Sequence, residues 1–290
     1  MLRTLIVSLR PTQWSKNLFV LAPLVFAEGL SDPTLVMRAL LAFAVWSAAA
    51  SSVYLVNDLH DRPKDRLHPI KRLRPIASGQ LAPTVAGSAA AVLAAAAIAG
   101  ALALGTRFSV VLVVYMVSSA LYSFGLKNVV IVDVMVVALG YVLRVEGGAA
   151  AIGVKVSTWI LLCTIFVALF LAFSKRRHEL LLLSEKAAGQ REVLLHYGPA
   201  FLDQMINVVT ASTLLCYALY TLAPETVEKF GTNALIYTLP FVLFGIFRYL
   251  YLVYQVTNPR NPTEAILRDA PFVLNVALWG MAVIAIIYFA

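Results

Sequence analysis

The stretch that decides the fold covers residues 39–65 and reads ALLAFAVWSAAASSVYLVNDLHDRPKD. Residues 39–56 are almost wholly apolar, and the acidic side chains Asp58, Asp61 and Asp65 follow within the next nine positions. An apolar run of about 20 residues is long enough to cross the hydrocarbon core of a bilayer as a helix. The sequence therefore predicts a membrane-spanning helix that delivers an acidic cluster to the membrane surface.

The composition of the whole chain extends this prediction. Of 290 residues, 61% are hydrophobic and only 13% are charged, and the mean hydropathy is +0.84, which is unlike a soluble globular domain. We expect an all-α integral membrane protein, with one transmembrane domain over residues 1–290. Nine apolar runs are predicted to span the membrane, and the first is short and carries Pro23. The runs are 17–30, 34–56, 83–104, 108–126, 128–152, 156–174, 203–222, 234–256 and 270–289.

The distribution of basic residues predicts the topology. Seventeen of the 23 Lys and Arg residues fall at the N-terminus or in the loops after the second, fourth, sixth and eighth runs. Positive residues are retained on the cytoplasmic side, so we expect a cytoplasmic N-terminus and an external C-terminus. The net charge of +8 then reflects topology and a basic cytoplasmic surface, and we expect no nucleic-acid partner.

The acidic cluster needs a reason of its own, since basic residues alone set the topology. Asn57, Asp61 and Asp65 are spaced so that a helix would place them on one face in successive turns. Oxygen ligands that leave positions open for phosphate oxygens are what Mg²⁺ prefers. Pro63 cannot lie inside a regular helix without a kink, so Asp65 is expected near or beyond the helix end. The alternative is a solvated loop in which the acids neutralise Arg62, Lys64 and Arg66.

Other segments on the same side of the membrane are basic. The segment LYSFGLKNVVIVD (121–133) carries Tyr122 and Lys127, and FSKRRHEL (173–180) carries Lys175, Arg176 and Arg177. Carboxylates beside clustered Lys and Arg residues at the membrane surface suit a polyphosphate bound through Mg²⁺ and direct ion pairs. Alternatively, residues 175–177 are an ordinary positive stop after a span.

Charged residues also lie inside the predicted spans, where they are costly and commonly functional. Arg144 and Glu146 fall in the fifth span, and Arg248 lies near the cytoplasmic end of the eighth. One interpretation has Arg144 and Glu146 facing a ribose or a polar cavity. The other has them pair with polar groups inside the bundle and hold the helices together.

The spans and motifs together resemble the UbiA superfamily of intramembrane prenyltransferases. The shared features are N-D-x-x-D-x-x-x-D at residues 57–65, Y-S-x-x-L-K at 122–127, and nine spans over nearly the whole chain. In that family the first motif binds diphosphate through Mg²⁺, and a second aspartate-rich motif follows the sixth span. Here the corresponding residues are Ser174 to Glu179, which are basic rather than acidic.

The basic segment at 174–179 and the segment LRPTQWSKNLFVLAPLVFA at 9–27 resemble one branch of the superfamily. This branch uses a phosphorylated sugar diphosphate as its donor. The branch transfers 5-phosphoribose from 5-phosphoribosyl 1-diphosphate to decaprenyl phosphate, releasing diphosphate, for arabinan cell-wall precursor synthesis. The resemblance implies a Mg²⁺-dependent phosphoribosyltransferase in a bacterial plasma membrane with a cytoplasmic site. Assembly into a homo-oligomer stays open. The alternatives are an aromatic or quinone prenyltransferase and, in another class, a secondary transporter for an anionic solute.

Roles for individual residues follow from this chemistry. We expect catalytic carboxylates at Asp58, Asp61 and Asp65, and metal ligands at Asn57 and Asp61. Arg144 and Glu146 are candidates for a ribose or cavity contact, and Arg248 for the lipid phosphate. The candidate ligands of the donor phosphates are Lys16, Tyr54, Lys64, Lys71, Arg72, Arg74, Tyr122, Lys127, Lys175, Arg176 and Arg177.

Overall fold

A computed structural model describes residues 2–68, 70–183, 196–255 and 268–289, and every regular element among them is helical. The chain divides into two compact units, with the described residues of the first ending at Val156 and those of the second beginning at Ser157. The prediction of one transmembrane domain over residues 1–290 stays a prediction.

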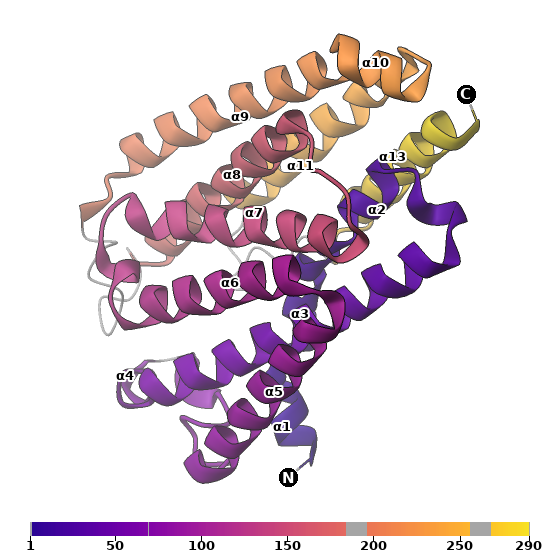
Figure 1. The fold of residues 1–290 in the computed structure, drawn as a ribbon. Coiled ribbons are helices and arrows are strands. Elements are labelled where there is room, and N and C mark those ends of the chain that lie inside the picture. The colour runs from indigo at the N-terminus through magenta and orange to yellow at the C-terminus, as the bar shows by residue number, and fades with distance from the viewer. Residues whose placement is uncertain (1, 69, 184–195, 256–267, 290) are drawn as a thin grey trace. The chain divides into compact units, whose positions relative to one another are not determined.

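The first unit is built around the apolar helix α3, which contains most of the stretch 39–65, and three other long helices. Figure 1 shows α3, α5, α6 and α7 in this unit, and α3 packs against each of the other three. The elements are α1 (Leu2–Leu9), η1 (Pro11–Val20), α2 (Ala22–Phe26), η2 (Gly29–Ser31), α3 (Pro33–His60), α4 (Arg62–Leu67), η3 (Lys71–Leu73), α5 (Pro83–Leu104), α6 (Thr106–Phe124), η4 (Leu126–Asn128) and α7 (Val132–Ile152).

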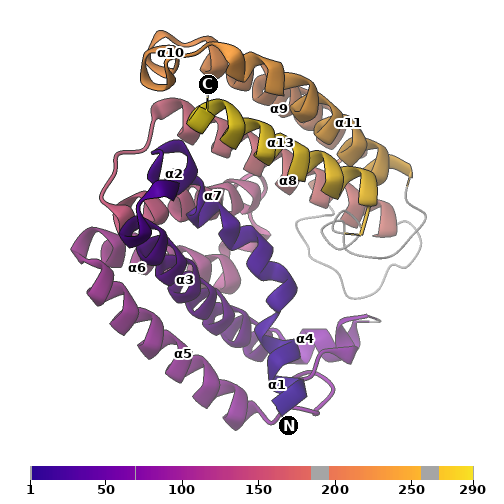
Figure 2. The same ribbon diagram turned by 90° about the vertical axis from the view of Figure 1, so that its right-hand side faces the viewer.

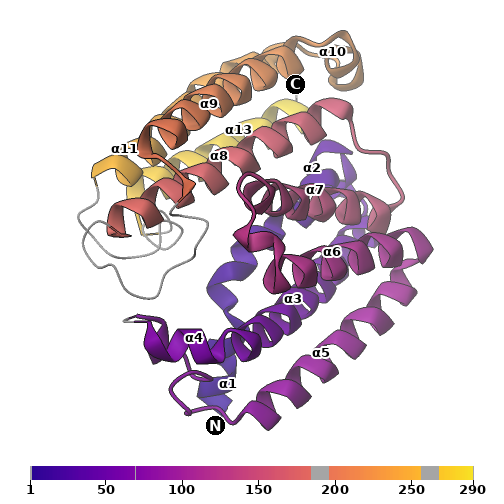
Figure 3. The same ribbon diagram turned by 90° about the vertical axis from the view of Figure 1, so that its left-hand side faces the viewer.

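The second unit is a set of packed helices in which α8 lies against α9 and α11, and α11 lies against α13 (Figure 3). Its elements are α8 (Thr158–Leu183), α9 (Pro199–Leu222), α10 (Pro224–Phe230), η6 (Ala234–Thr238), α11 (Leu239–Gln255) and α13 (Ala270–Phe289). Helix α8 runs past the predicted end of the sixth span. Residues 174–179, expected in a loop, therefore lie on a helix.

The prediction of nine regular spans needs correction. The described residues contain eight helices that are long and apolar enough to cross a membrane, and the run at 17–30 is not among them. That run is divided between η1, α2 and η2, with Pro11 and Pro23 near the starts of η1 and α2 and left-handed backbone at Arg10 and Glu28. Figure 2 shows this segment crossing α3, and η1 packs on both α3 and α7.

Both ends of α3 follow from its sequence. At its start, Asp32 Oδ1 accepts hydrogen bonds from the backbone N–H groups of Thr34 (2.7 Å) and Leu35 (3.3 Å), as a helix N-cap does. At its other end, Pro63 lies in the first turn of α4, where proline is tolerated. The expected break at Pro63 is confirmed, and Asp65 lies beyond the end of α3.

Small residues let the elements of the first unit approach closely, as is common between membrane helices. Trp46 is fully buried and packs edge-on against Phe108, with ring centroids 5.9 Å apart. A Cβ added to Gly147 would come within 2.1 Å of the Trp46 ring. A Cβ added to Gly148 would come within 1.9 Å of the Val20 carbonyl oxygen, so this glycine sets how closely η1 packs on α7.

We predict that Gly148→Ala lowers the stability of the purified protein by about 1–3 kcal/mol or more, because the new methyl group meets backbone that cannot rotate away. Thermal unfolding in detergent measures the change. Gly87→Ala is the matched control, because nothing lies within 4 Å of its added Cβ; alanine there is expected to be neutral or stabilising. Equal melting temperatures for the two variants would contradict the assigned role of Gly148.

Candidate functional site

The acidic motif lies at the end of α3 and continues through α4. Asn57 and Asp58 occupy the last turn of α3, Asp61 is its C-cap residue, and Asp65 lies in α4. Hydrogen bonds run from the Asp61 N–H to the Asn57 carbonyl oxygen and from the Asp65 N–H to the Asp61 carbonyl oxygen, both at 2.8 Å. The one-turn spacing of these residues therefore persists across the helix break.

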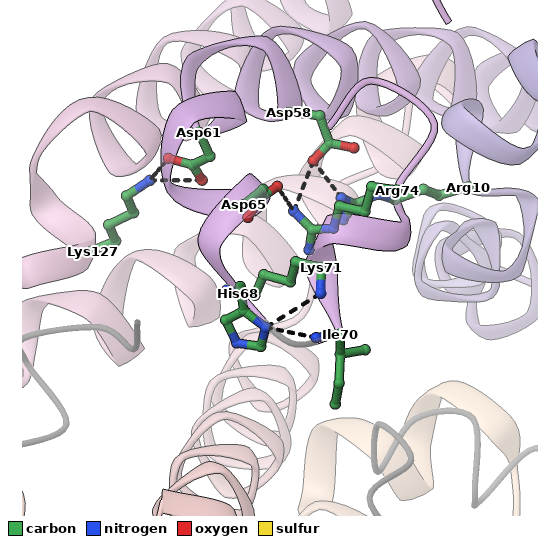
Figure 4. Close-up of polar contacts among 9 residues, drawn as sticks. All are labelled: Arg10, Asp58, Asp61, Asp65, His68, Ile70, Lys71, Arg74 and Lys127. Atoms are coloured by element: carbon green, nitrogen blue, oxygen red, sulfur yellow. Dashed lines mark hydrogen bonds and ion pairs between the residues drawn. The ribbon is translucent and has the colours of Figure 1, made fainter. Parts of the chain in front are cut away.

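Two of the three carboxylates are buried in ion pairs with arginine. Asp58 Oδ1 accepts hydrogen bonds from Arg10 Nη2 at 2.5 Å and from Arg74 Nη1 at 3.1 Å (Figure 4). Arg74 Nη1 also donates to Asp65 Oδ2 at 2.7 Å. The side chains of Asp58 and Asp65 are each only 4% exposed, and an unpaired carboxylate at that depth would be costly. These pairs fasten the 62–80 segment and the start of η1 to the end of α3.

Asp61 has a different partner. Both of its oxygens accept hydrogen bonds from Lys127 Nζ, at 2.7 and 3.0 Å (Figure 4). Lys127 comes from η4, directly after α6. The structure thus brings together the two motifs that the sequence singled out at 57–65 and 122–127.

This arrangement bears on the expected metal. Among the described residues, no group of three or more His, Cys, Asp or Glu side chains is placed to hold a metal ion. Mg²⁺, however, is usually bound through one or two carboxylates together with waters and substrate phosphates. Asn57 and Asp61 supply oxygen donors one turn apart and are only half-buried. They fit a magnesium ion that obtains its other ligands from a phosphate substrate, whereas Asp58 and Asp65 are held by arginine.

The basic residues of α4 and η3 divide into two kinds. Arg62 Nε donates to the Ile76 carbonyl oxygen and Arg66 Nε to the Ala77 carbonyl oxygen, both at 3.2 Å, so these two arginines brace the segment itself. Lys64 and Arg72 are exposed and Lys71 is half-buried. The alternative in which the acids neutralise Arg62, Lys64 and Arg66 gains no support, because the three carboxylates are paired with Arg10, Arg74 and Lys127.

Aromatic candidates lie nearby. The Arg10 guanidinium lies over the Tyr54 ring, 5.1 Å from its centroid, which places Tyr54 one turn before the acidic motif and beside its arginine. Tyr122 is half-buried in the last turns of α6. Their assignment to the donor phosphates stays a prediction.

Arg144 lies in a buried polar centre on α7. Its Nε donates to Asn17 Oδ1 (2.9 Å), its Nη1 to the Gly140 carbonyl oxygen (2.7 Å), and its Nη2 to the Tyr115 hydroxyl (3.1 Å). Glu146 points elsewhere and pairs with Arg107 at 3.3 Å. The two residues therefore do not share one contact, and the prediction that both face one cavity gains no support. Asn17 and Tyr115 were missed because neither carries charge.

The second unit holds the basic residues 175–177 on α8. Arg176 Nη1 pairs with Glu179 Oε2 at 2.6 Å, and Arg177 Nε pairs with Asp203 Oδ1 of α9 at 2.8 Å. Lys175 Nζ lies 3.8 Å from Glu179 Oε1. The Tyr254 hydroxyl of α11 donates to the same Asp203 oxygen at 2.6 Å. Sequence reasoning missed Asp203 and Tyr254, since single polar residues at span ends carry no pattern.

Arg248 is already paired. Its Nε and Nη2 donate to the two carboxylate oxygens of Asp269, at 3.0 and 2.8 Å, and Asp269 also accepts from the Phe272 N–H at 2.9 Å at the start of α13. A bidentate pair of this kind neutralises the guanidinium and fixes α11 to α13. The assignment of Arg248 to the lipid phosphate stays a prediction, and this pairing weighs against it.

His68 orders the turn after α4 in a way that depends on pH. Its Nδ1 accepts hydrogen bonds from the backbone N–H groups of Ile70 (3.1 Å) and Lys71 (3.2 Å) (Figure 4). Burial lowers the pKa of His68 below its usual value, and the charges of Lys71 and Arg74 act in the same direction against Asp65. Neutral His68 therefore stabilises the turn at pH values above the ordinary histidine pKa. This stabilisation is lost as the pH falls through the lowered pKa of His68.

We predict faster amide exchange in residues 70–74 of the wild type as the pH falls through the lowered pKa of His68, relative to His68→Asn at the same pH. Asparagine keeps an acceptor oxygen and does not titrate. Hydrogen–deuterium exchange of both proteins, compared at each pH, measures the effect. A constant ratio of exchange rates from pH 7.5 to 5 would show that His68 does not control this turn.

The UbiA prenyltransferase family matches residues 17–276. Among curated relatives, decaprenyl-phosphate phosphoribosyltransferase of Mycobacterium tuberculosis is 34% identical over 97% of this chain and 93% of its own. The protein of the same name from Corynebacterium glutamicum is 33% identical over 98% of this chain and 86% of its own.

Among solved structures, a UbiA homolog from Archaeoglobus fulgidus bound to GPP and Mg²⁺ aligns with a TM-score of 0.72. It is 21% identical and the alignment covers 98% of this chain and 99% of that one, so the likeness concerns the fold. The eight apolar helices and the matched residues 17–276 lead to one conclusion: the chain is a multi-pass membrane protein of the UbiA prenyltransferase family.

Proposed function

We propose that this protein transfers 5-phosphoribose from 5-phosphoribosyl 1-diphosphate to a polyprenyl phosphate and releases diphosphate. The observation that carries the proposal is a sequence pattern: the acidic motif at 57–65 is present, whereas residues 174–179, where the resemblance to UbiA prenyltransferases implies a second acidic motif, include Lys175, Arg176 and Arg177. The names of the mycobacterial and corynebacterial relatives support the same reaction and favour decaprenyl phosphate as the acceptor.

The reaction makes and breaks one bond each at the ribose anomeric carbon. The bond from C1 to the diphosphate oxygen breaks, and an oxygen of the lipid phosphate forms the new bond to C1. That acceptor oxygen is already anionic at neutral pH, so the site needs no general base. The protein has to align the two phosphorylated substrates and stabilise the charge that develops on the departing diphosphate.

The first unit supplies groups for this task. Asn57 and Asp61 would hold magnesium, which when bound shields the negative charge of the diphosphate. Lys127 contacts Asp61 and so stands beside any phosphate that Asp61 helps to bind. Asp58 and Asp65 act indirectly, because they hold Arg10 and Arg74 in position through ion pairs. Lys64, Lys71 and Arg72 offer further cations on the adjoining segment.

The orientation in the membrane belongs to the same proposal. We place the acidic motif on the cytoplasmic side of a bacterial plasma membrane, where the basic segments predict it to lie. Soluble sugar phosphates are available there, and the lipid phosphate reaches the site from the bilayer.

The discriminating experiment gives the purified protein two donors. Labelled 5-phosphoribosyl 1-diphosphate is incubated with a polyprenyl phosphate, and labelled geranyl diphosphate is incubated with an aromatic acceptor, both with Mg²⁺ in detergent. The lipid products are then separated. We expect lipid-linked phosphoribose and no prenyl transfer. Transfer from geranyl diphosphate alone, the kind of ligand bound by the archaeal homolog, would replace this proposal with a prenyltransferase. A lack of transfer from either donor would also reject it and would direct attention to anion transport.

We further predict that Asp61→Asn lowers kcat by a factor on the order of 10²–10³, because it removes the anionic ligand that would hold magnesium, and magnesium counters the negative charge that develops on the diphosphate. The measurement is initial rates at saturating Mg²⁺. Asp32→Asn is the matched control: it makes the same change at the N-cap of α3, where asparagine caps as well as aspartate. Loss of less than about threefold in Asp61→Asn would remove Asp61 from the proposed metal site.

A further inference from the structure

Arg144 is a buried cation with no acidic partner in the described part of the chain. Its side chain is 5% exposed, and its three side-chain hydrogen bonds go to neutral oxygens of Asn17, Gly140 and Tyr115. The guanidinium also lies over the Tyr115 and Tyr141 rings, 4.9 and 5.5 Å from their centroids. Neutral oxygens and ring faces orient the charge without compensating it.

Lys16 adds a second uncompensated charge to the same region. It precedes Asn17 on η1, the element that packs on α7, and no ion pair joins it to a carboxylate among the described residues. Burial lowers the pKa of Lys16 to about 8, and the positive charges of Arg144 and Arg10 act in the same direction. Repulsion from two guanidinium groups indicates that the lysine faces cations and no anion.

The other titratable groups around this centre do not supply the missing charge. Tyr115 on α6 and Tyr141 on α7 face the Arg144 guanidinium, and Tyr54 on α3 faces Arg10. All three are neutral as phenols at physiological pH. Arg10 already forms an ion pair with Asp58. Glu146, two residues after Arg144, forms its ion pair with Arg107. Keeping two cations inside a membrane protein without an anion is costly, so the arrangement calls for a bound anion.

We propose that Lys16 and Arg144 form a binding site for a phosphate monoester, with Asn17 and Tyr115 as the residues that position Arg144. The proposal rests on the proposed function, which brings two such groups to the protein: the 5-phosphate of the donor and the phosphate of the lipid acceptor. A dianionic monoester matches the two positive charges in number. Arg248, by contrast, is neutralised by Asp269.

The test measures binding without magnesium and without turnover, so that it does not depend on the transfer reaction. The full-length protein in detergent and EDTA is titrated by calorimetry with ribose 5-phosphate and, separately, with a short-chain polyprenyl monophosphate. At pH 7 we expect Lys16→Met to weaken at least one probe about tenfold, while Lys16→Arg stays within about twofold of the wild type. Lys16 is half-buried, so these variants are less disruptive than changes to Arg144.

The pH profile separates a phosphate contact from a structural role. The second ionisation of a phosphate monoester lies near pH 6, so the probe is dianionic throughout a series from pH 7.5 to 9.5. Wild-type Kd should rise as the free lysine loses its proton above about pH 8, whereas Lys16→Arg should bind equally well across the series. Arg107→Gln, a change to an exposed arginine paired with Glu146, should leave both probes unaffected.

The two probes identify the source of the phosphate. Loss of affinity for ribose 5-phosphate alone assigns the site to the donor, and loss for the polyprenyl monophosphate alone assigns it to the acceptor. Wild-type affinity of Lys16→Met for both probes would overturn the proposal, as would a wild-type pH profile identical to that of Lys16→Arg. Binding that depends on Lys16 in a protein that transfers no phosphoribose would instead reject the proposed function and leave this site in place.

Discussion

Charge compensation at the end of α3 is the constraint on which the rest of the first unit depends. An apolar helix delivers three carboxylates to one place, and such groups are stable there only when opposite charges meet them. The partners come from three separate segments: Arg10 before η1, Arg74 before α5, and Lys127 after α6. Meeting this requirement therefore also folds the polar segments onto the helix end and builds a basic surface around the acids.

The same constraint bears on the proposed magnesium site, which would need only one or two protein carboxylates beside substrate phosphates and waters. Asp58 and Asp65 are buried and engaged by arginine, so they organise the site, whereas Asp61 is held by a single lysine. A divalent cation that approaches Asp61 competes with Lys127. A substrate diphosphate changes that balance, because it provides ligands for the cation and a new partner for the lysine.

Much of the fold followed from the sequence because membrane spans are encoded by length and hydropathy, which can be counted. The spans 83–104 and 270–289 coincide with α5 and α13, and Pro63 ends α3 where its lost N–H and fixed ring predict. The prediction of a regular span at 17–30 was wrong, because apolar composition does not distinguish one straight helix from a series of short 3-10 and α-helices. Helix α8 extends beyond the predicted end of the sixth span at residue 174, because basic residues that end an apolar run do not necessarily end a helix.

The site was predictable in its acidic and basic motifs but not in its pairings. Hydrogen bonds such as Arg144 to Asn17 join residues 127 positions apart, and a neutral asparagine gives no signal at that separation. The Arg248 to Asp269 pair could not be predicted for the same reason. The sequence shows that an arginine is present, but it does not show which residue pairs with it. Tertiary contacts thus decide which cations stay available to bind phosphate.

The competition between Lys127 and a divalent cation for Asp61 is the most direct test of this account. Mn²⁺ binding to the donor-free protein, followed by electron paramagnetic resonance, should be at least tenfold tighter in Lys127→Met than in the wild type. The gain should disappear in the double variant Lys127→Met, Asp61→Asn. Equal Mn²⁺ affinity in the wild type and Lys127→Met would contradict the account, because it would mean that the lysine does not compete with a divalent cation for the carboxylate proposed to hold the metal.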